Sequence, residues 1–209
     1  MQRYTTIALF SAIALSVGIL GVYGLTSVPS TLKVQSDTQT IGAVPMLGHV
    51  TMTVTDPHGN ILAYHQGDNV VVNQAEDCLS KKVFGIASNI CPGGGAVYSV
   101  IGLGNQSSPS TANKTNTGLQ HEVTNQAGLT RLAASTLTET DATSGAPVSD
   151  VLQVQFTDSS PSAATITEAG LFNSTVVSSV GMFAHQTFTG VTLNSGDSLT
   201  VKWTVTMGT

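Results

Sequence analysis

The chain has 209 residues, of which 41% are hydrophobic and only 9% are charged, and its formal net charge is −5. This composition excludes a disordered chain, because the apolar content is sufficient for a core while Thr, Ser, Asn and Gln supply the polarity. Seven Lys and Arg residues cannot form the basic stripe that phosphate neutralisation needs, so we expect no nucleic-acid partner.

Residues 1–24 open the chain with one charge, Arg3, followed by an almost purely apolar run at residues 7–20. A short basic start, an apolar centre and a small-residue exit at Gly24 are typical of a cleaved secretory signal peptide. An uncleaved membrane anchor is the alternative, since about 20 apolar residues can span a bilayer. We favour cleavage, because polar residues follow without a Lys or Arg cluster. We therefore expect an extracellular, cell-surface protein that meets the membrane only during export.

Residues 25–47 are predicted to be an N-terminal extension. Apolar residues are sparse there, and Leu32, Val34 and Ile41 are the candidates for one buried face of an isolated strand. Two alternatives stay open, namely a flexible spacer and a strand that folds back on its own domain.

Residues 48–209 are predicted to form one all-β domain. The clearest strand is residues 198–207, in which Leu199, Val201, Trp203 and Val205 share one face and are predicted core residues. Short strands separated by Gly, Pro, Ser and Asp clusters indicate an antiparallel β-sandwich or jelly-roll-like fold. The predicted strands are residues 49–55, 61–65, 69–72, 96–103, 129–137, 151–156, 164–172, 182–188 and 198–207.

Residues 73–84 are the single predicted helix, with apolar residues at spacings of three and four and with Lys81 and Lys82 in the last turn. Cys78 and Cys91 form an even pair, which in an exported chain predicts a disulfide that fastens this helix to one end of the sandwich. Two free buried thiols are the alternative. We expect no metal site, because no further Cys exists and no His lies at ligand spacing.

Three Asn-x-Ser/Thr sequons begin at Asn105, Asn113 and Asn173. In an exported protein such sequons predict N-glycans on surface loops. We therefore expect covalent glycans as the protein's non-protein partners.

No motif supports catalysis. The Gly-rich stretch at residues 93–95 lacks the Lys of a phosphate loop, no Gly-x-Ser-x-Gly motif is present, and the carboxylates are scattered along the chain. We expect neither an enzyme nor a bound cofactor.

Several motifs resemble a known family. They are Ile-Gly-Leu-Gly-Asn at residues 101–105, Ile-Thr-Glu-Ala-Gly-Leu-Phe-Asn at residues 166–173, and the strand ending in Trp-Thr-Val-Thr at residue 206, with Glu122 and Arg131 between them. In this order they resemble β-rich structural proteins encoded by tailed phages and prophages, over roughly the C-terminal two thirds of the chain. That resemblance implies an assembly component without catalysis.

The signal peptide, the cysteine pair and the sequons depart from that family. An exported, Thr-rich β-domain with an N-terminal extension is similar in organisation to archaeal surface-filament subunits of the thread type. This resemblance implies that the extension of one subunit completes the sandwich of the next, with Leu32, Val34 and Ile41 as the inward anchors of a donor strand. Identical subunits would then be the protein partners.

These observations favour a structural subunit of an extracellular filament, with a role in adhesion or cell–cell contact. Two alternatives remain: a membrane-anchored or secreted monomeric β-sandwich that binds surface partners, and a virus-derived structural protein.

Overall fold

The computed structural model describes residues 45–86, 91, 97–177 and 181–208. The predicted signal peptide and the predicted anchors Leu32, Val34 and Ile41 lie outside the described residues.

The helix α2 spans Asn73–Val83. The strands are β1 (Met46–Thr55), β2 (Ile61–Asp68), β3 (Val70–Val71), β4 (Val100–Gly104), β5 (Leu132–Ala133), β6 (Thr136–Thr140), β7 (Val148–Thr157), β8 (Ala164–Phe172), β9 (Met182–Leu193) and β10 (Ser198–Met207).

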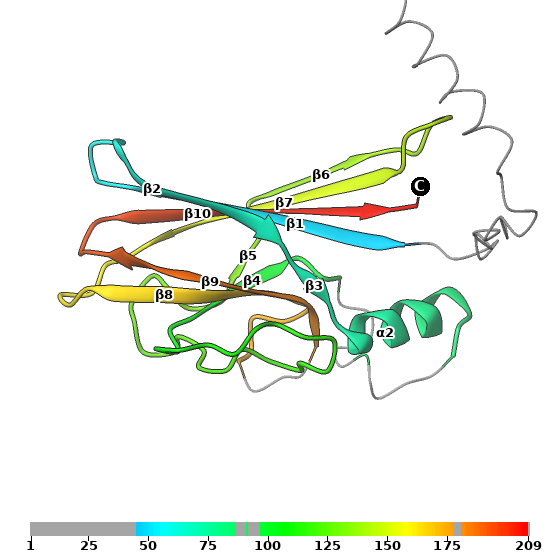
Figure 1. Cartoon of the computed structure of the whole chain (residues 1–209), viewed down its shortest axis with the longest axis horizontal. Helices are drawn as coiled ribbons and strands as arrows, with labels where there is room; N and C mark the ends of the chain where they lie inside the picture. The colour runs from blue at the N-terminus through cyan, green and yellow to red at the C-terminus, as the bar shows by residue number, and fades with distance from the viewer. Residues whose placement is uncertain (1–44, 87–90, 92–96, 178–180, 209) are drawn as a thin grey trace, which may run out of the picture. The chain divides into compact units, whose positions relative to one another are not determined.

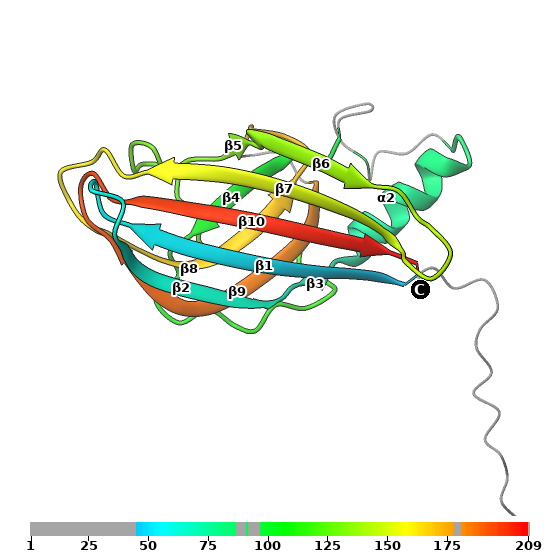
Figure 2. The ribbon, with the colours of Figure 1, turned by 90° about the horizontal axis from the view of Figure 1, so that it is seen from above.

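Two five-stranded antiparallel sheets pack face to face, and α2 lies at one end of them (Figures 1 and 2). Sheet A has the strand order β2-β1-β10-β7-β6, and sheet B has the order β3-β9-β8-β4-β5. The predicted all-β sandwich with one short helix is therefore confirmed. Met46 and Leu47, which we assigned to the extension, belong to β1.

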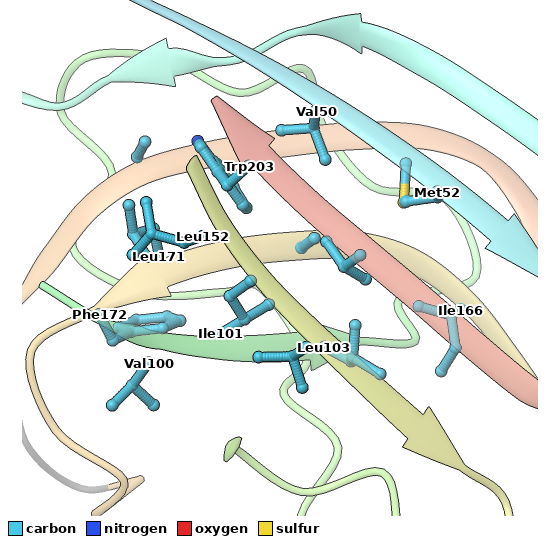
Figure 3. Packing of buried hydrophobic residues seen from close by; sticks show 14 of the residues in the cluster. Val50, Met52, Val100, Ile101, Leu103, Leu152, Ile166, Leu171, Phe172 and Trp203 are labelled. Atoms are coloured by element: carbon cyan, nitrogen blue, oxygen red, sulfur yellow. The ribbon is translucent and has the colours of Figure 1, made fainter. Parts of the chain in front are cut away.

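The core follows from two-residue alternation in the central strands of sheet A. In β1 and β10, Val50 lies opposite Trp203 and Met52 lies opposite Val201, so these four side chains share the inner face. Trp203 is 0% exposed and packs among residues of both sheets (Figure 3). Each large side chain that is fully buried contributes about 1.5–3 kcal/mol relative to exposure. All four core residues predicted in β10 are buried, namely Leu199, Val201, Trp203 and Val205.

Sheet B is covered on its outer face as well. Residues 105–131, which we call the outer loop, run along this face beneath β8 and β4 (Figure 1). The N–H of Asn105 donates to the carbonyl of His121, and the N–H of Val123 donates to the carbonyl of Leu103. Because this third layer shields the sheet from water, β8 is buried on both faces from residue 166 onward.

Glycines in the resemblance motifs make room for this outer layer. A Cβ on Gly104 would lie 3.0 Å from Glu168 Cβ and 3.1 Å from the His121 carbonyl oxygen, and a Cβ on Gly170 would lie 2.7 Å from the Phe172 ring. Such contacts are at or below the limit that packed atoms tolerate. The Gly-Leu-Gly and Glu-Ala-Gly sequences thus have a steric cause.

The prediction of one continuous strand at residues 129–137 is wrong. Leu129 is buried, and the rest of the segment divides into β5 of sheet B and β6 of sheet A. The chain changes sheet between Ala134, whose N–H donates to the Ser99 carbonyl, and Ser135, whose N–H donates to the Gln153 carbonyl. Period-two alternation continues through such a crossing, so the sequence pattern does not reveal it. The strand predicted at residues 96–103 begins later, at Val100.

The helix α2 buries Ala75 and Cys78 and ends one residue before the predicted boundary, where Gly85 takes a left-handed φ of 66°. Cys78 and Cys91 form a disulfide with an S–S distance of 2.08 Å, as predicted.

Within the described ranges, no helix has the length and apolar character required to cross a membrane.

We predict that Gly170→Ala destabilises the fold by about 1–3 kcal/mol, because the added methyl group must displace the Phe172 ring. Urea denaturation measures the loss. Gly118→Ala is the matched control, since a Cβ there meets no atom within 4 Å. Equal stability of the two variants would contradict the steric account of the outer layer.

Candidate functional site

An apolar groove of about 290 Å³ opens at the end of the sandwich that carries α2. It lies between the two sheets, which part at this end (Figure 1). Asp150 of β7, Tyr98 and Ser99 bring polar groups to a lining that is mostly apolar. The main apolar side chains are Leu79 of α2, Leu137 of β6, Leu152 of β7, Leu171 of β8, Phe183 of β9 and Met207 of β10.

The groove borders an exposed edge strand. β6 is the last strand of sheet A, and all five of its residues are exposed. Leu137 lines the groove and is 61% exposed. An edge strand presents backbone N–H and C=O groups on its free side, where another strand can pair with them.

Two polar groups beside the groove have no hydrogen-bond partner among the described residues. They are the Tyr98 hydroxyl, which belongs to a residue of the lining, and Trp203 Nε1, whose residue pairs with Leu152 of the lining. Burial raises the pKa of Tyr98 further above its usual value, which is already well above neutral pH, and the hydroxyl is a donor at neutral pH. Buried polar groups are normally paired, so the Tyr98 hydroxyl, whose residue lines the groove, is the candidate to bind an incoming polar partner.

A second polar cluster lies beneath the outer loop. Glu168 and His185 are both fully buried, with 3.0 Å between Oε2 and Nε2. His185 Nδ1 lies 2.9 Å from Asn116 Oδ1, and the backbone N–H groups of Gln120 and His121 donate to the Glu168 carboxylate. Burial would raise the pKa of Glu168, but the hydrogen bond from His185, the backbone N–H of Gln120, the charge of His185 and the N–H of His121 together hold it below its usual value.

A third cluster surrounds Arg131. Its guanidinium binds Glu122 through both carboxylate oxygens, at 2.5 and 2.9 Å, and its carbon lies 3.6 Å from the centroid of the Phe172 ring. Its remaining nitrogen donates to the carbonyls of Ser174 and Val176. The resemblance motifs thus converge on two buried ion pairs, and the hydrogen bonds and the ring contact that these pairs make with the other layer hold the outer loop to sheet B.

The clusters differ in what they offer to a ligand. The two ion pairs are buried, and their polar atoms are bonded to other parts of the chain. The groove is open, and polar groups without a partner lie beside it. Within the described ranges, no three His, Cys, Asp or Glu side chains gather to hold a metal ion. We therefore take the groove as the candidate binding site.

The predicted glycan sites differ in exposure. Asn113 is exposed, and its Oδ1 accepts hydrogen bonds from the N–H and hydroxyl of Thr115. Asn105 is half-buried and contacts the His121 ring. Asn173, which follows β8, is only 6% exposed, and the chain at Gly181 packs directly against its amide. Asn173 is thus the least accessible of the three sites, and glycans remain a prediction for Asn105, Asn113 and Asn173.

Sequence reasoning missed the groove and its acidic residue. One signal was present, since Asp150 occupies the same phase of β7 as the core residues Leu152, Val154 and Phe156. An acidic residue in that phase indicates an opening in the core. The Glu168–His185 pair carries no comparable signal, because its partners are brought together only by the pairing of β8 with β9.

The chain matches no family model, and a search of curated proteins also gives no match. The resemblances to filament subunits and to phage structural proteins therefore stay predictions.

We predict that Glu168→Gln lowers the free energy of unfolding by about 1.5–3 kcal/mol at neutral pH, because it removes charged hydrogen bonds in a buried site. The folded-state pKa of Glu168 is lowered, so its contribution is present above the usual value of 4.5 and is lost as the pH falls through the lowered value. The difference between wild type and variant should therefore shrink in acid. Urea denaturation at a series of pH values measures it.

The control for this experiment is Asp141→Asn, which alters an exposed carboxylate and should change stability by less than about 0.5 kcal/mol. A difference between wild type and Glu168→Gln that does not vary with pH would contradict the assigned role of the Glu168 charge.

Proposed function

We propose that this chain is a structural subunit of an extracellular filament, polymerising head-to-tail by donor-strand complementation. In this proposal residues 25–44 of one subunit dock in the groove of the next. The filament serves adhesion or cell–cell contact and has no catalytic role.

The groove is the observation that carries the proposal. An open apolar channel beside an exposed edge strand is what an added β-strand requires, because the edge supplies main-chain hydrogen bonds and the channel accepts alternate side chains. The Tyr98 hydroxyl, which has no hydrogen-bond partner among the described residues, gives a docked peptide backbone one further donor.

The extension has suitable length and attachment. Met46, the first residue of β1, lies opposite Met207, which lines the groove, so the extension joins the domain at this end of the sandwich. Twenty extended residues reach about 66 Å, whereas the longest strands of the domain, with ten to twelve residues, span about 33–40 Å. The extension is thus long enough to reach a neighbouring copy. A contact between a tail and a different surface propagates into a filament.

Export is part of the proposal. A leader at residues 1–24, a disulfide between Cys78 and Cys91, and an exposed sequon at Asn113 are mutually consistent with an oxidising, extracellular location. Cleavage of the leader would free residue 25 as the new N-terminus of the extension.

We predict that a chain beginning at residue 45 remains monomeric at concentrations at which the chain beginning at residue 25 forms filaments, because the shorter chain keeps its groove but has no donor strand. Analytical ultracentrifugation and electron microscopy measure the assembly. A synthetic peptide of residues 25–44 should bind the shorter chain and change the fluorescence of Trp203, the single tryptophan of the protein.

A peptide with Leu32, Val34 and Ile41 all replaced by Ser is the control, and it should bind far more weakly because it loses the apolar anchors. Filaments formed by the shorter chain would contradict donor-strand assembly. A monomeric longer chain whose leader is retained in cells would favour an anchored binding domain.

A further inference from the structure

A buried carboxylate lies where the outer loop meets the turn between β7 and β8. Asp158 is 0% exposed, and among the described residues it forms no ion pair. The backbone N–H and the hydroxyl of Ser160 both donate to Asp158 Oδ1, at 2.9 and 2.5 Å. The Ser162 carbonyl is a second acceptor for this hydroxyl at 3.0 Å, but the carboxylate is closer and charged and therefore binds it more strongly. A carboxylate in this position can act as a general base and make the serine a nucleophile.

The serine hydroxyl also contacts a carboxamide of the outer loop. Gln126 Nε2 lies 2.6 Å from Ser160 Oγ. It also lies 2.7 Å from the Ser162 carbonyl oxygen and 3.5 Å from Asp158 Oδ2. All three neighbours accept hydrogen bonds, so they fix the amide with its nitrogen toward the cluster. Because the amide C–N bond is about 1.33 Å long, Ser160 Oγ lies at most about 3.9 Å from Gln126 Cδ, close to the about 3–3.5 Å of a reactive pair.

Main-chain contacts hold these two segments together next to the cluster. The N–H of Ser159 donates to the Ala127 carbonyl at 3.0 Å. Gly128 has a φ of 83°, and a Cβ there would lie 1.9 Å from the Thr157 carbonyl oxygen, so only glycine allows this approach. The hydroxyl and the carboxamide are thus held side by side by contacts that do not involve their own side chains. Such fixed proximity is what favours a reaction between neighbouring groups.

We propose that Ser160 and Gln126 become joined by an intramolecular ester, with Asp158 as the base. Ser160 Oγ attacks Gln126 Cδ while the Asp158 carboxylate takes the hydroxyl proton. The C–N bond of the carboxamide then breaks, and Asp158 gives the proton to the departing nitrogen, which leaves as ammonia. One hydroxyl and one carboxamide thus yield one ester and one ammonia, without an oxidant or a co-reactant, and Asp158 returns to its ionised form.

The ester ties the outer loop to the point where the chain passes from one sheet to the other, since β7 belongs to sheet A and β8 to sheet B. The covalent ring that it closes contains β5, β6 and β7. Ser160 is only 8% exposed, so water has little access to the bond and hydrolysis is slow. The inference does not rest on the proposed function, because it applies to a monomer as well as to a filament subunit.

Tryptic peptide mapping of the purified full-length chain, reduced and digested near neutral pH, tests the ester. The sequence has no Lys or Arg at residues 115–130 or 132–201, so trypsin gives peptide 115–131 with Gln126 and peptide 132–202 with Ser160. Mass spectrometry should find the two peptides joined, with a mass lower than their sum by one ammonia. Hydroxylamine at neutral pH, which cleaves esters but not ordinary amides, should separate them and leave a hydroxamate on residue 126.

Ser160→Ala removes the nucleophile and should release peptide 115–131 in free form. Ser159→Ala is the matched control, because it removes the exposed hydroxyl of the preceding residue, and its two peptides should stay joined. Asp158→Asn removes the base and should lower the joined fraction in freshly purified protein by at least about tenfold.

The wild-type chain alone decides the outcome, so the test does not depend on the folding of any variant. A free peptide 115–131 with an unmodified Gln126 as its main product would overturn the ester. A link that persists in Ser160→Ala, or that resists hydroxylamine, would also overturn it. None of these results bears on the filament proposal, which is tested separately by the chain that begins at residue 45.

Discussion

The two sheets bury their inner faces against each other around Trp203, and this packing loosens into an open groove at the end that carries α2. The pairing of β1 with β10 sets both features. It places Val50 and Met52 beside the inward residues of β10, and it brings Met46 next to Met207 at the groove. The same ladder therefore builds the core and fixes the point at which the extension joins the domain.

Buried charge has a different role on the other side of sheet B. There Glu168 with His185, and Glu122 with Arg131, hold the outer loop in place. The ion pairs are closed to solvent, and glycines such as Gly104 allow the layers to approach. By contrast, Asp150, which lines the groove, has no ion-pair partner within the described part of the chain.

The sequence predicted most of the β-architecture because burial on one face imposes a two-residue period, as in β10, and because a helix and a disulfide have local signatures. It did not predict the division of residues 129–137 between two sheets, since alternation carries no record of which sheet a strand joins. The burial of Asn173 and the His185–Glu168 contact depend on segments that meet only in the folded chain. The groove could have been inferred only from Asp150, whose position in the apolar phase of β7 conflicts with the pattern around it.

The central claim is that a strand of one copy occupies the groove of another, and site-specific cross-linking tests this most directly. A chain with Leu32→Cys is mixed with a chain with Leu137→Cys under mild oxidation, and the products are identified by mass spectrometry. Leu137 lines the groove on the edge strand β6, so the account predicts a disulfide that joins residue 32 of one chain to residue 137 of the other. Assembled filaments that contain no such link, or that link equally well when the cysteine is moved from position 137 to the exposed Leu62 of β2, would contradict it.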